Sequence, residues 1–253
     1  MPIVIQKDLP AFDILTKENI FVMPTNRAIT QDIRPLEIAI VTLMPTKIET
    51  ETQLLRLLGN TPLQVNVTLI NTASYKSRHV SENHMAKFYR SFDEVKNKKF
   101  DGMIITGAPV ETMSFEDIDY WDELTEIIDY AQKNIFTTIY ICWGAQAALY
   151  HLYGIDKIPL PKKMFGIFPT VALQPNELLT KGLSDVFYIP HSRHTAINER
   201  EIARHPELVP LARSEEAGLS IIKSADNKNI FITGHVEYDR DTLKNEYFRD
   251  LNK

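Results

Sequence analysis

Cys142 is the single cysteine of the 253-residue chain, and it lies where a strand-like segment meets a helix-like one. Residues 137–141 (TTIYI) favour a buried strand, and residues 144–153 favour a helix. Such a turn presents a nucleophile at a sharp elbow and leaves the following backbone N–H free to bind an oxyanion. The start of a helix also raises the thiolate fraction of a thiol. We therefore interpret Cys142 as a nucleophile.

A second group of chemically active residues is Gly234-His235-Val236-Glu237, at the end of a strand expected over residues 229–234. Residues two apart on a strand point to the same face, so Glu237 and His235 can lie side by side. The carboxylate can then fix the imidazole tautomer while the other ring nitrogen faces a thiol. Together with Cys142, these residues match the nucleophile, base and orienting acid of covalent catalysis.

The elements expected around these residues alternate between strands and helices. In the first half we expect strands at 36–44, 65–70, 102–106 and 137–141, and helices after residue 47 and over 81–99, 116–133 and 144–153. In the second half we expect mainly strands, at 165–173, 185–190, 209–213, 218–223 and 229–234. This order predicts an α/β fold with a doubly wound, mostly parallel sheet flanked by helices, and a mixed or antiparallel extension in the second half. We expect residues 1–34 to form an N-terminal arm and residues 35–253 a single domain.

The composition restricts the classes of function. The net charge of −5 with scattered basic residues argues against nucleic-acid binding. No apolar run approaches the roughly 18–20 residues of a membrane span, and no signal pattern precedes the domain, so we expect a cytoplasmic protein. One cysteine excludes an internal disulfide framework and any site with several cysteine ligands.

His191 and His194, with Arg193 between them, are a further possible metal or phosphate site. Their spacing fits no standard zinc pattern, and no nearby cysteine completes one. We interpret the segment as a structural loop beside the pocket and expect no metal.

The elbow cysteine followed by His-x-Glu resembles the class I glutamine amidotransferase fold. The amidotransferase elbow usually has glycine two positions before the cysteine, and Tyr140 stands there, which argues against glutamine hydrolysis. Several segments resemble more closely the homoserine O-acyltransferases of methionine biosynthesis. These segments are MPTKIETE (44–51), NTPLQV (60–65), TGAPV (106–110), CWGAQ (142–146), KMFG (163–166), PHSRHT (190–195) and GHVEY (234–238). The resemblance covers roughly residue 30 to the end of the chain.

This resemblance implies an acyl-thioester on Cys142, with His235 as general base and Glu237 orienting it. The oxyanion would be held by the Trp143 N–H and a donor from the Gly107-Ala108 turn. The resemblance also places Lys47 close to the catalytic centre.

Substrate recognition follows from the same resemblance. Lys163 and Ser192 match substrate-contacting positions, and Arg249 matches the residue that holds the homoserine carboxylate, a natural partner for a guanidinium. Glu111 matches the position that selects the acyl donor, where glutamate accompanies acetyl because it fills space and repels the succinyl carboxylate. We therefore expect acetyl-CoA as co-substrate, L-homoserine as acceptor, no permanently bound cofactor and a homodimer.

Alternatives remain open at this point. Homoserine O-succinyltransferase and serine O-acetyltransferase activities would use the same scaffold, and homoserine differs from serine by one methylene, worth only about 1–3 kcal/mol of discrimination. A glutamine amidase of the parent fold would release ammonia from glutamine, and the elbow glycine that is missing from this chain argues against it. A catalytically inactive binding or regulatory protein is a further alternative. The presence of Cys142, His235 and Glu237 together argues against it.

Overall fold

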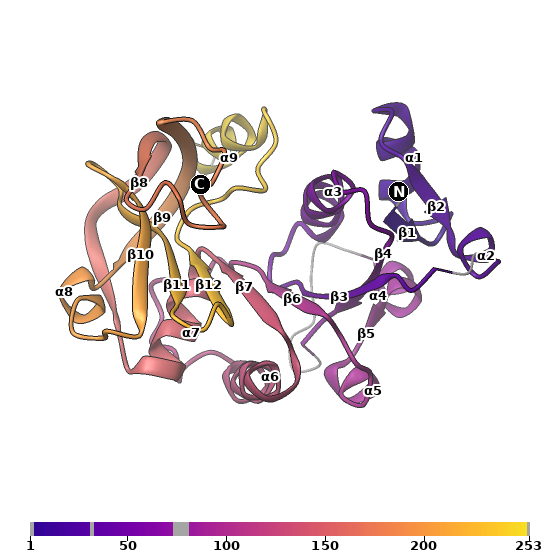
Figure 1. Cartoon of the computed structure of the whole chain (residues 1–253), viewed down its shortest axis with the longest axis horizontal. Helices are drawn as coiled ribbons and strands as arrows, with labels where there is room; N and C mark the ends of the chain where they lie inside the picture. The colour runs from indigo at the N-terminus through magenta and orange to yellow at the C-terminus, as the bar shows by residue number, and fades with distance from the viewer. Residues whose placement is uncertain (1–2, 31–32, 73–80, 252–253) are drawn as a thin grey trace. The chain divides into compact units, whose positions relative to one another are not determined.

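The computed structural model describes residues 3–30, 33–72 and 81–251, which form alternating strands and helices (Figure 1). Their contacts divide the chain into two compact units. The first contains Met1–Thr106 and Asp119–Thr138, and the second contains Gly107–Ile118 and Ile139–Lys253.

The first unit is built on a parallel sheet in the order β2-β1-β4-β3-β6, with β5 beside β4. Its strands are β1 (Ile3–Ile5), β2 (Val22–Pro24), β3 (Leu36–Val41), β4 (Val65–Ile70), β5 (Tyr89–Arg90) and β6 (Gly102–Ile105). The apolar end of β3, Ala39–Val41, is completely buried. Such burial is typical of strands in a parallel sheet that is covered on both faces.

Helices cover both faces of this sheet, with α3 on one side and α5 on the other in Figure 1. The helices of the unit are α1 (Pro10–Lys17), α2 (Thr25–Ala28), α3 (Lys47–Leu58), α4 (Glu82–Phe88), α5 (Phe92–Val95) and α6 (Trp121–Asn134). In α6 the buried residues Leu124, Ile127, Ile128 and Ala131 recur at helical spacing and form one apolar stripe. The expected doubly wound α/β architecture is confirmed.

Two segments of this unit differ from the sequence-based expectation. The single helix expected over 81–99 is wrong: Tyr89 adopts an extended conformation and forms β5 with its neighbour. Ser91 then starts a new helix through a capping box with Glu94. The segment expected as an arm contributes β1 and β2, because its short apolar runs pair in parallel with β4 and with each other.

The second unit contains the expected antiparallel part of the fold. Its strands follow the order β7-β12-β11-β10-β8-β9, and neighbouring strands from β12 through β9 pair antiparallel. They are β7 (Thr137–Ile141), β8 (Lys157–Ala172), β9 (Val186–Ile197), β10 (Leu208–Ser214), β11 (Gly218–Ser224) and β12 (Asn229–Ile232). The helices are α7 (Trp143–Tyr153), α8 (Glu199–Ile202) and α9 (Thr242–Leu251). A core of Ile189, Leu211, Ala212, Ile221 and Ile230 joins four of the strands.

Within the described ranges, none of the helices combines the length and the apolar character that a membrane span requires.

Candidate active site

Cys142 lies at a strained turn between β7 and α7. Its backbone has φ 52° and ψ −115°, in a region that non-glycine residues rarely adopt. The Cys142 N–H donates to the Ile232 carbonyl of β12 at 2.7 Å, and its carbonyl accepts from the Ala145 N–H at 3.0 Å. These two bonds hold the residue between the sheet and the first turn of the helix. The side chain is therefore fixed at the elbow that the sequence predicts.

The residues packed around the elbow leave it little free space. A Cβ atom added to Gly107 would lie 3.2 Å from the Cys142 Cβ and 3.6 Å from the His235 Cε1. Ala108 and Trp143 are buried, and Trp143 is the first residue of α7. The Trp143 N–H is thus one of the backbone donors at the N-terminus of α7. This arrangement can supply a hydrogen bond to an oxyanion formed at Cys142.

His235 and Glu237 lie just beyond β12 rather than within it, since the strand ends at Ile232. The bend still brings the two side chains together, with the His235 Nδ1 2.7 Å from the Glu237 Oε1. Both residues are buried, and the His235 N–H donates to the Pro190 carbonyl of β9 at 2.8 Å. The Nδ1 contact leaves Nε2 as the ring nitrogen available to a thiol.

The electrostatics of His235 match those of a base that shares a proton with a thiol. Burial disfavours the imidazolium, but the charge of Cys142 and then that of Glu237 favour it, and both groups also form hydrogen bonds with the ring. Their combined effect raises the pKa of His235 well above its ordinary value. The two neighbours of His235 therefore stabilise its imidazolium form.

Tyr238 is a member of the site that the sequence analysis missed. Its ring stacks on that of His235 with centroids 4.1 Å apart and planes 17° from parallel. Its hydroxyl donates to the Glu246 Oε1 of α9 at 2.8 Å. The pKa of Tyr238 is raised, mainly by burial and then by the charge of Glu246. Tyr238 stays neutral and locks the imidazole plane. Its place directly after the His-x-Glu pattern was the sequence feature that could have identified Tyr238 as part of the site.

The expected substrate-binding cations share one carboxylate. The Lys163 Nζ lies 2.6 Å from the Asp250 Oδ2, and the Arg249 Nε lies 3.1 Å from the Asp250 Oδ1. Lys163 comes from β8, and Arg249 and Asp250 come from α9. Ser192 is buried on β9 opposite Phe165 of β8. The structure thus brings Lys163 and Arg249 together around Asp250, an acidic residue that the sequence analysis did not identify.

Glu111 lines a cavity in the second unit. Its carboxylate accepts the backbone N–H of His194 in β9, which fixes its direction. The cavity has a volume of about 400 Å³. Lys157 lies at its edge with Nζ 3.9 Å from the centre of the Phe115 ring. Glu111 therefore contributes a fixed negative charge to a cavity large enough for part of a ligand.

Lys47 belongs to the first unit and is almost completely buried there. Its Nζ donates to the Thr42 carbonyl at 2.8 Å and lies 5.1 Å from the Tyr89 ring centre. Burial lowers the pKa of Lys47 to about 8, and the nearby Glu51 opposes this effect. Glu51 in turn accepts the Tyr89 hydroxyl at 2.6 Å. A lysine of this kind carries a proton that it can lose near neutral pH.

The segment expected as a loop beside the pocket forms part of the long strand β9. His191 and Arg193 are buried in it, and His194 is exposed. Burial, reinforced by the charges of Arg193 and His235, lowers the pKa of His191 to about 3. In the part of the chain that the structure describes, no group of three or more His, Cys, Asp or Glu side chains could hold a metal ion.

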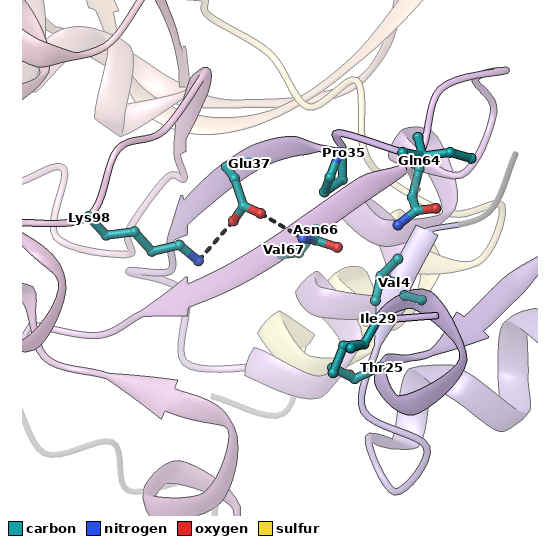
Figure 2. A pocket seen from close by; sticks show the side chains of 11 residues that line it. Val4, Thr25, Ile29, Pro35, Glu37, Gln64, Asn66, Val67 and Lys98 are labelled. Carbon is teal, nitrogen blue, oxygen red and sulfur yellow. Dashed lines mark hydrogen bonds and ion pairs between the residues drawn. The ribbon is translucent and has the colours of Figure 1, made fainter. Parts of the chain in front are cut away.

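A further cavity, of about 480 Å³, lies in the first unit (Figure 2). The Glu37 carboxylate on its wall lies 2.8 Å from the Lys98 Nζ and accepts the Asn66 amide at 2.6 Å. Apolar side chains such as Val4 and Ile29 complete the lining. Its described lining residues include no nucleophile with a base, so the candidate active site remains the one at Cys142.

The chain has a glutamine amidotransferase-like α/β fold. Solved structures with this fold superimpose on the chain. A glutamine amidotransferase from Thermotoga maritima does so with TM-score 0.60 and 11% identity over 86% of this chain and 84% of that one. The glutaminase domain of CTPS from Trypanosoma brucei does so with TM-score 0.54 and 10% identity, over 81% and 87%. At such identities the likeness concerns the fold alone.

Sequence comparison establishes the family to which this chain belongs. The model of the homoserine O-succinyltransferase family matches residues 2–253, and the chain belongs to this family. It is 55% identical to homoserine O-acetyltransferase 1 of Ilyobacter polytropus, over all of this chain and 84% of that protein. It is 56% identical to the homoserine O-acetyltransferase of Acetivibrio thermocellus, over all of this chain and 83% of that protein.

Proposed function

We propose that this protein is a homoserine O-acetyltransferase that passes the acetyl group of acetyl-CoA through a thioester on Cys142 to the hydroxyl of L-homoserine. The observation that carries the proposal is the Cys142–His235–Glu237 arrangement on a chain 55% identical to a homoserine O-acetyltransferase. A thiol suits this chemistry because it exchanges with a thioester at little energetic cost and leaves well in the second step.

In the first half-reaction His235 holds the proton of Cys142, and the thiolate attacks the acetyl carbonyl of acetyl-CoA. The Trp143 N–H and a donor from the Gly107–Ala108 turn bind the oxyanion. When the tetrahedral intermediate collapses, the bond to the CoA sulfur breaks, and the His235 imidazolium returns the proton to that sulfur. Glu237 keeps the ring oriented and stabilises its positive charge.

In the second half-reaction neutral His235 takes the proton from the homoserine hydroxyl, whose oxygen attacks the thioester. The Cys142 sulfur leaves as the thiolate and restores the starting state. Lys163, Ser192 and Arg249 would hold the homoserine, with Arg249 binding its carboxylate. Lys47 is a further proposed residue of the site, on the family resemblance.

Donor selection is assigned to Glu111. Its fixed carboxylate would repel the terminal carboxylate of a succinyl group and leave the smaller acetyl group unaffected. In a panel of acyl donors we expect wild type to prefer acetyl-CoA and Glu111→Gly to gain at least about tenfold in relative use of succinyl-CoA. Faster turnover of succinyl-CoA by wild type would overturn the donor assignment and favour homoserine O-succinyltransferase activity.

The acceptor is tested separately, by CoA release from acetyl-CoA with homoserine or serine. We expect homoserine to support the higher kcat/KM. A preference for serine would assign the protein to serine O-acetylation, and ammonia release from glutamine would assign it to amide hydrolysis. The family resemblance also leads us to expect a cytoplasmic homodimer in methionine biosynthesis without a bound cofactor, and size-exclusion chromatography with light scattering checks the oligomeric state.

A further inference from the structure

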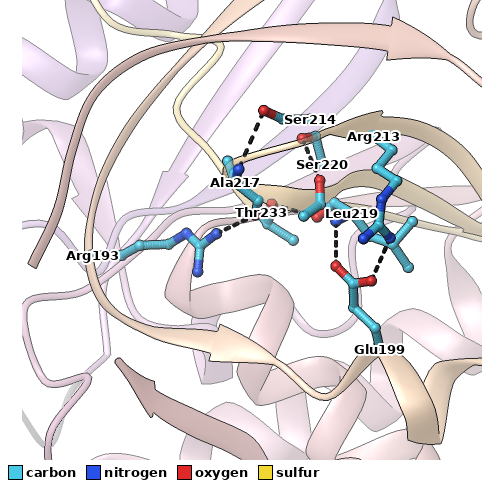
Figure 3. A network of polar contacts seen from close by, with 9 residues as sticks. Arg193, Glu199, Arg213, Ser214, Ala217, Leu219, Ser220 and Thr233 are labelled. Carbon is cyan, nitrogen blue, oxygen red and sulfur yellow. Dashed lines mark hydrogen bonds and ion pairs between the residues drawn. The ribbon is translucent and has the colours of Figure 1, made fainter. Parts of the chain in front are cut away.

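Arg193 of β9 is a buried cation, and among the described residues its hydrogen bonds end on neutral acceptors. The residue is 2% exposed. Its Nε donates to the His191 Nδ1 at 3.2 Å, its Nη1 to the Thr195 carbonyl at 2.6 Å, and its Nη2 to the Ala217 carbonyl at 2.7 Å. Figure 3 shows the Arg193 guanidinium reaching Ala217. Removing such a charge from water costs several kcal/mol unless another charge compensates for it.

Other basic residues of this unit are neutralised in the usual way. Arg213 forms an ion pair with Glu199 in the same network of Figure 3, and it is partly exposed. Lys223 is nearly as buried as Arg193, but its Nζ lies 2.8 Å from the Glu177 carboxylate. Within the described part of the chain Arg193 has no carboxylate partner, which distinguishes it from these cations and indicates that its charge serves another group.

Two chains of contacts connect Arg193 with the catalytic elements. On one side, Thr195 donates its hydroxyl to the Gln146 Oε1 at 2.8 Å, and the Gln146 N–H donates to the Cys142 carbonyl at 3.3 Å. Gln146 lies one turn along α7 from Cys142. Arg193 therefore supports the helix that begins at the nucleophile.

On the other side, the His191 ring packs against the strand end that carries the base. A Cβ atom added to Gly234 would lie only 2.9 Å from the His191 Cε1. The neighbouring Pro190 carbonyl accepts the His235 N–H at 2.8 Å. Because the Arg193 Nε donates to the His191 Nδ1, the neutral ring carries its proton on Nε2.

The negative groups that act on Arg193 identify what its charge serves. Burial lowers the pKa of Arg193, and the opposing influences are Cys142 first, then Glu111 and Glu199. Glu199 already pairs with Arg213, and Glu111 accepts the His194 N–H. Cys142 is thus the group that both the contact through Gln146 and the charge of the guanidinium reach.

We propose that Arg193 is a positioning residue of the acyl-transfer site, whose guanidinium holds the Cys142 and His235 segments in register and whose positive charge stabilises the Cys142 thiolate. The assignment deepens the proposed function. It can be tested without any acyl donor, because the thiolate reacts with alkylating agents and Cys142 is the single cysteine of the chain.

The experiment compares the rate of Cys142 alkylation by iodoacetamide between pH 5 and 9 in wild type, Arg193→Lys, Arg193→Met and Arg213→Met. We expect Arg193→Met to react about tenfold more slowly near pH 6 and its profile to move about one pH unit higher. Arg193→Lys keeps the charge and should retain the profile, and Arg213→Met should behave as wild type. The other titratable groups around this pair are His191, His235, Glu237, Tyr238, Glu111 and Glu199, and none of them is substituted in any variant.

Thermal melting of each variant separates a structural role from an electrostatic one. A wild-type alkylation profile in Arg193→Met, accompanied only by a lower Tm, would overturn the proposal. If Arg193→Met fails to fold, Arg193→Gln is the neutral variant to measure, because its amide can still donate to one of the two carbonyls. Shifted alkylation in a protein that releases no CoA from acetyl-CoA would refute the proposed function and leave the role of Arg193 standing.

Discussion

The buried amine of Lys47 gives a quantitative prediction about the pH dependence of stability. Burial lowers its pKa from 10.5 to about 8. Each pKa unit is worth about 1.4 kcal/mol, so the charged amine costs the folded state about 3 kcal/mol at neutral pH. Between pH 8 and 10.5 the folded protein has lost this proton while the unfolded chain still binds it. The contribution of Lys47 to the free energy of unfolding therefore increases with pH.

The test compares wild type with Lys47→Met by urea unfolding at pH 7 and pH 10. The substitution also removes the hydrogen bond to the Thr42 carbonyl and the contact with the Tyr89 ring, so its effect at one pH is a sum of terms. The change of this stability difference between pH 7 and pH 10 isolates the contribution of the Lys47 charge. We expect the free energy of unfolding of wild type, relative to Lys47→Met, to rise by about 2 kcal/mol between pH 7 and pH 10.

Lys99→Met is the matched control, because Lys99 is an exposed lysine of the same unit. Its difference from wild type should be the same at both pH values. A Lys47→Met difference that is also the same at both pH values would refute the reasoning, since it would mean that the Lys47 ammonium is as well solvated in the folded protein as in the unfolded chain.

Three further results are expected. Glu237→Gln should slow acylation of Cys142 by roughly 10²–10⁴-fold and lower the His235 pKa in an NMR titration; an unchanged pKa would show that the 2.7 Å contact does not stabilise the imidazolium. Gly107→Ala should slow acylation by about tenfold, because the new methyl group lies 3.2 Å from the Cys142 Cβ and displaces the reacting groups; wild-type rates would show that the elbow tolerates it. Dialysis against EDTA should leave CoA release unchanged, and loss of activity restored by a divalent cation would contradict the metal-free mechanism.

The sequence predicted the elements whose signals are local. The apolar run before Cys142 and the helix after it indicated the elbow, and the short His235-x-Glu237 spacing indicated the pair that the structure brings to 2.7 Å. In contrast, one helix was expected across residues 81–99. The Ser91–Glu94 capping box and the pairing of β5 with β4 broke that helix.

The parts that could not be predicted depend on contacts between distant residues. Tyr238 meets Glu246 only because α9 packs beside the base, and Asp250 meets Lys163 across a separation of 87 residues. Arg193 was interpreted as part of a loop because the spacing of His191 and His194 fits no standard zinc pattern. Its burial depends on acceptors supplied by the Thr195 and Ala217 backbones, which the sequence pattern does not reveal.

The central claim is that Cys142 carries the acetyl group, and intact-mass spectrometry tests it most directly. Purified protein is mixed with acetyl-CoA without acceptor, with Cys142→Ala as control, and homoserine is then added. The account predicts one acetyl adduct on wild type, none on Cys142→Ala, and rapid loss of the adduct with homoserine. Homoserine acetylation by Cys142→Ala at the wild-type rate, or an adduct that homoserine cannot discharge, would contradict it.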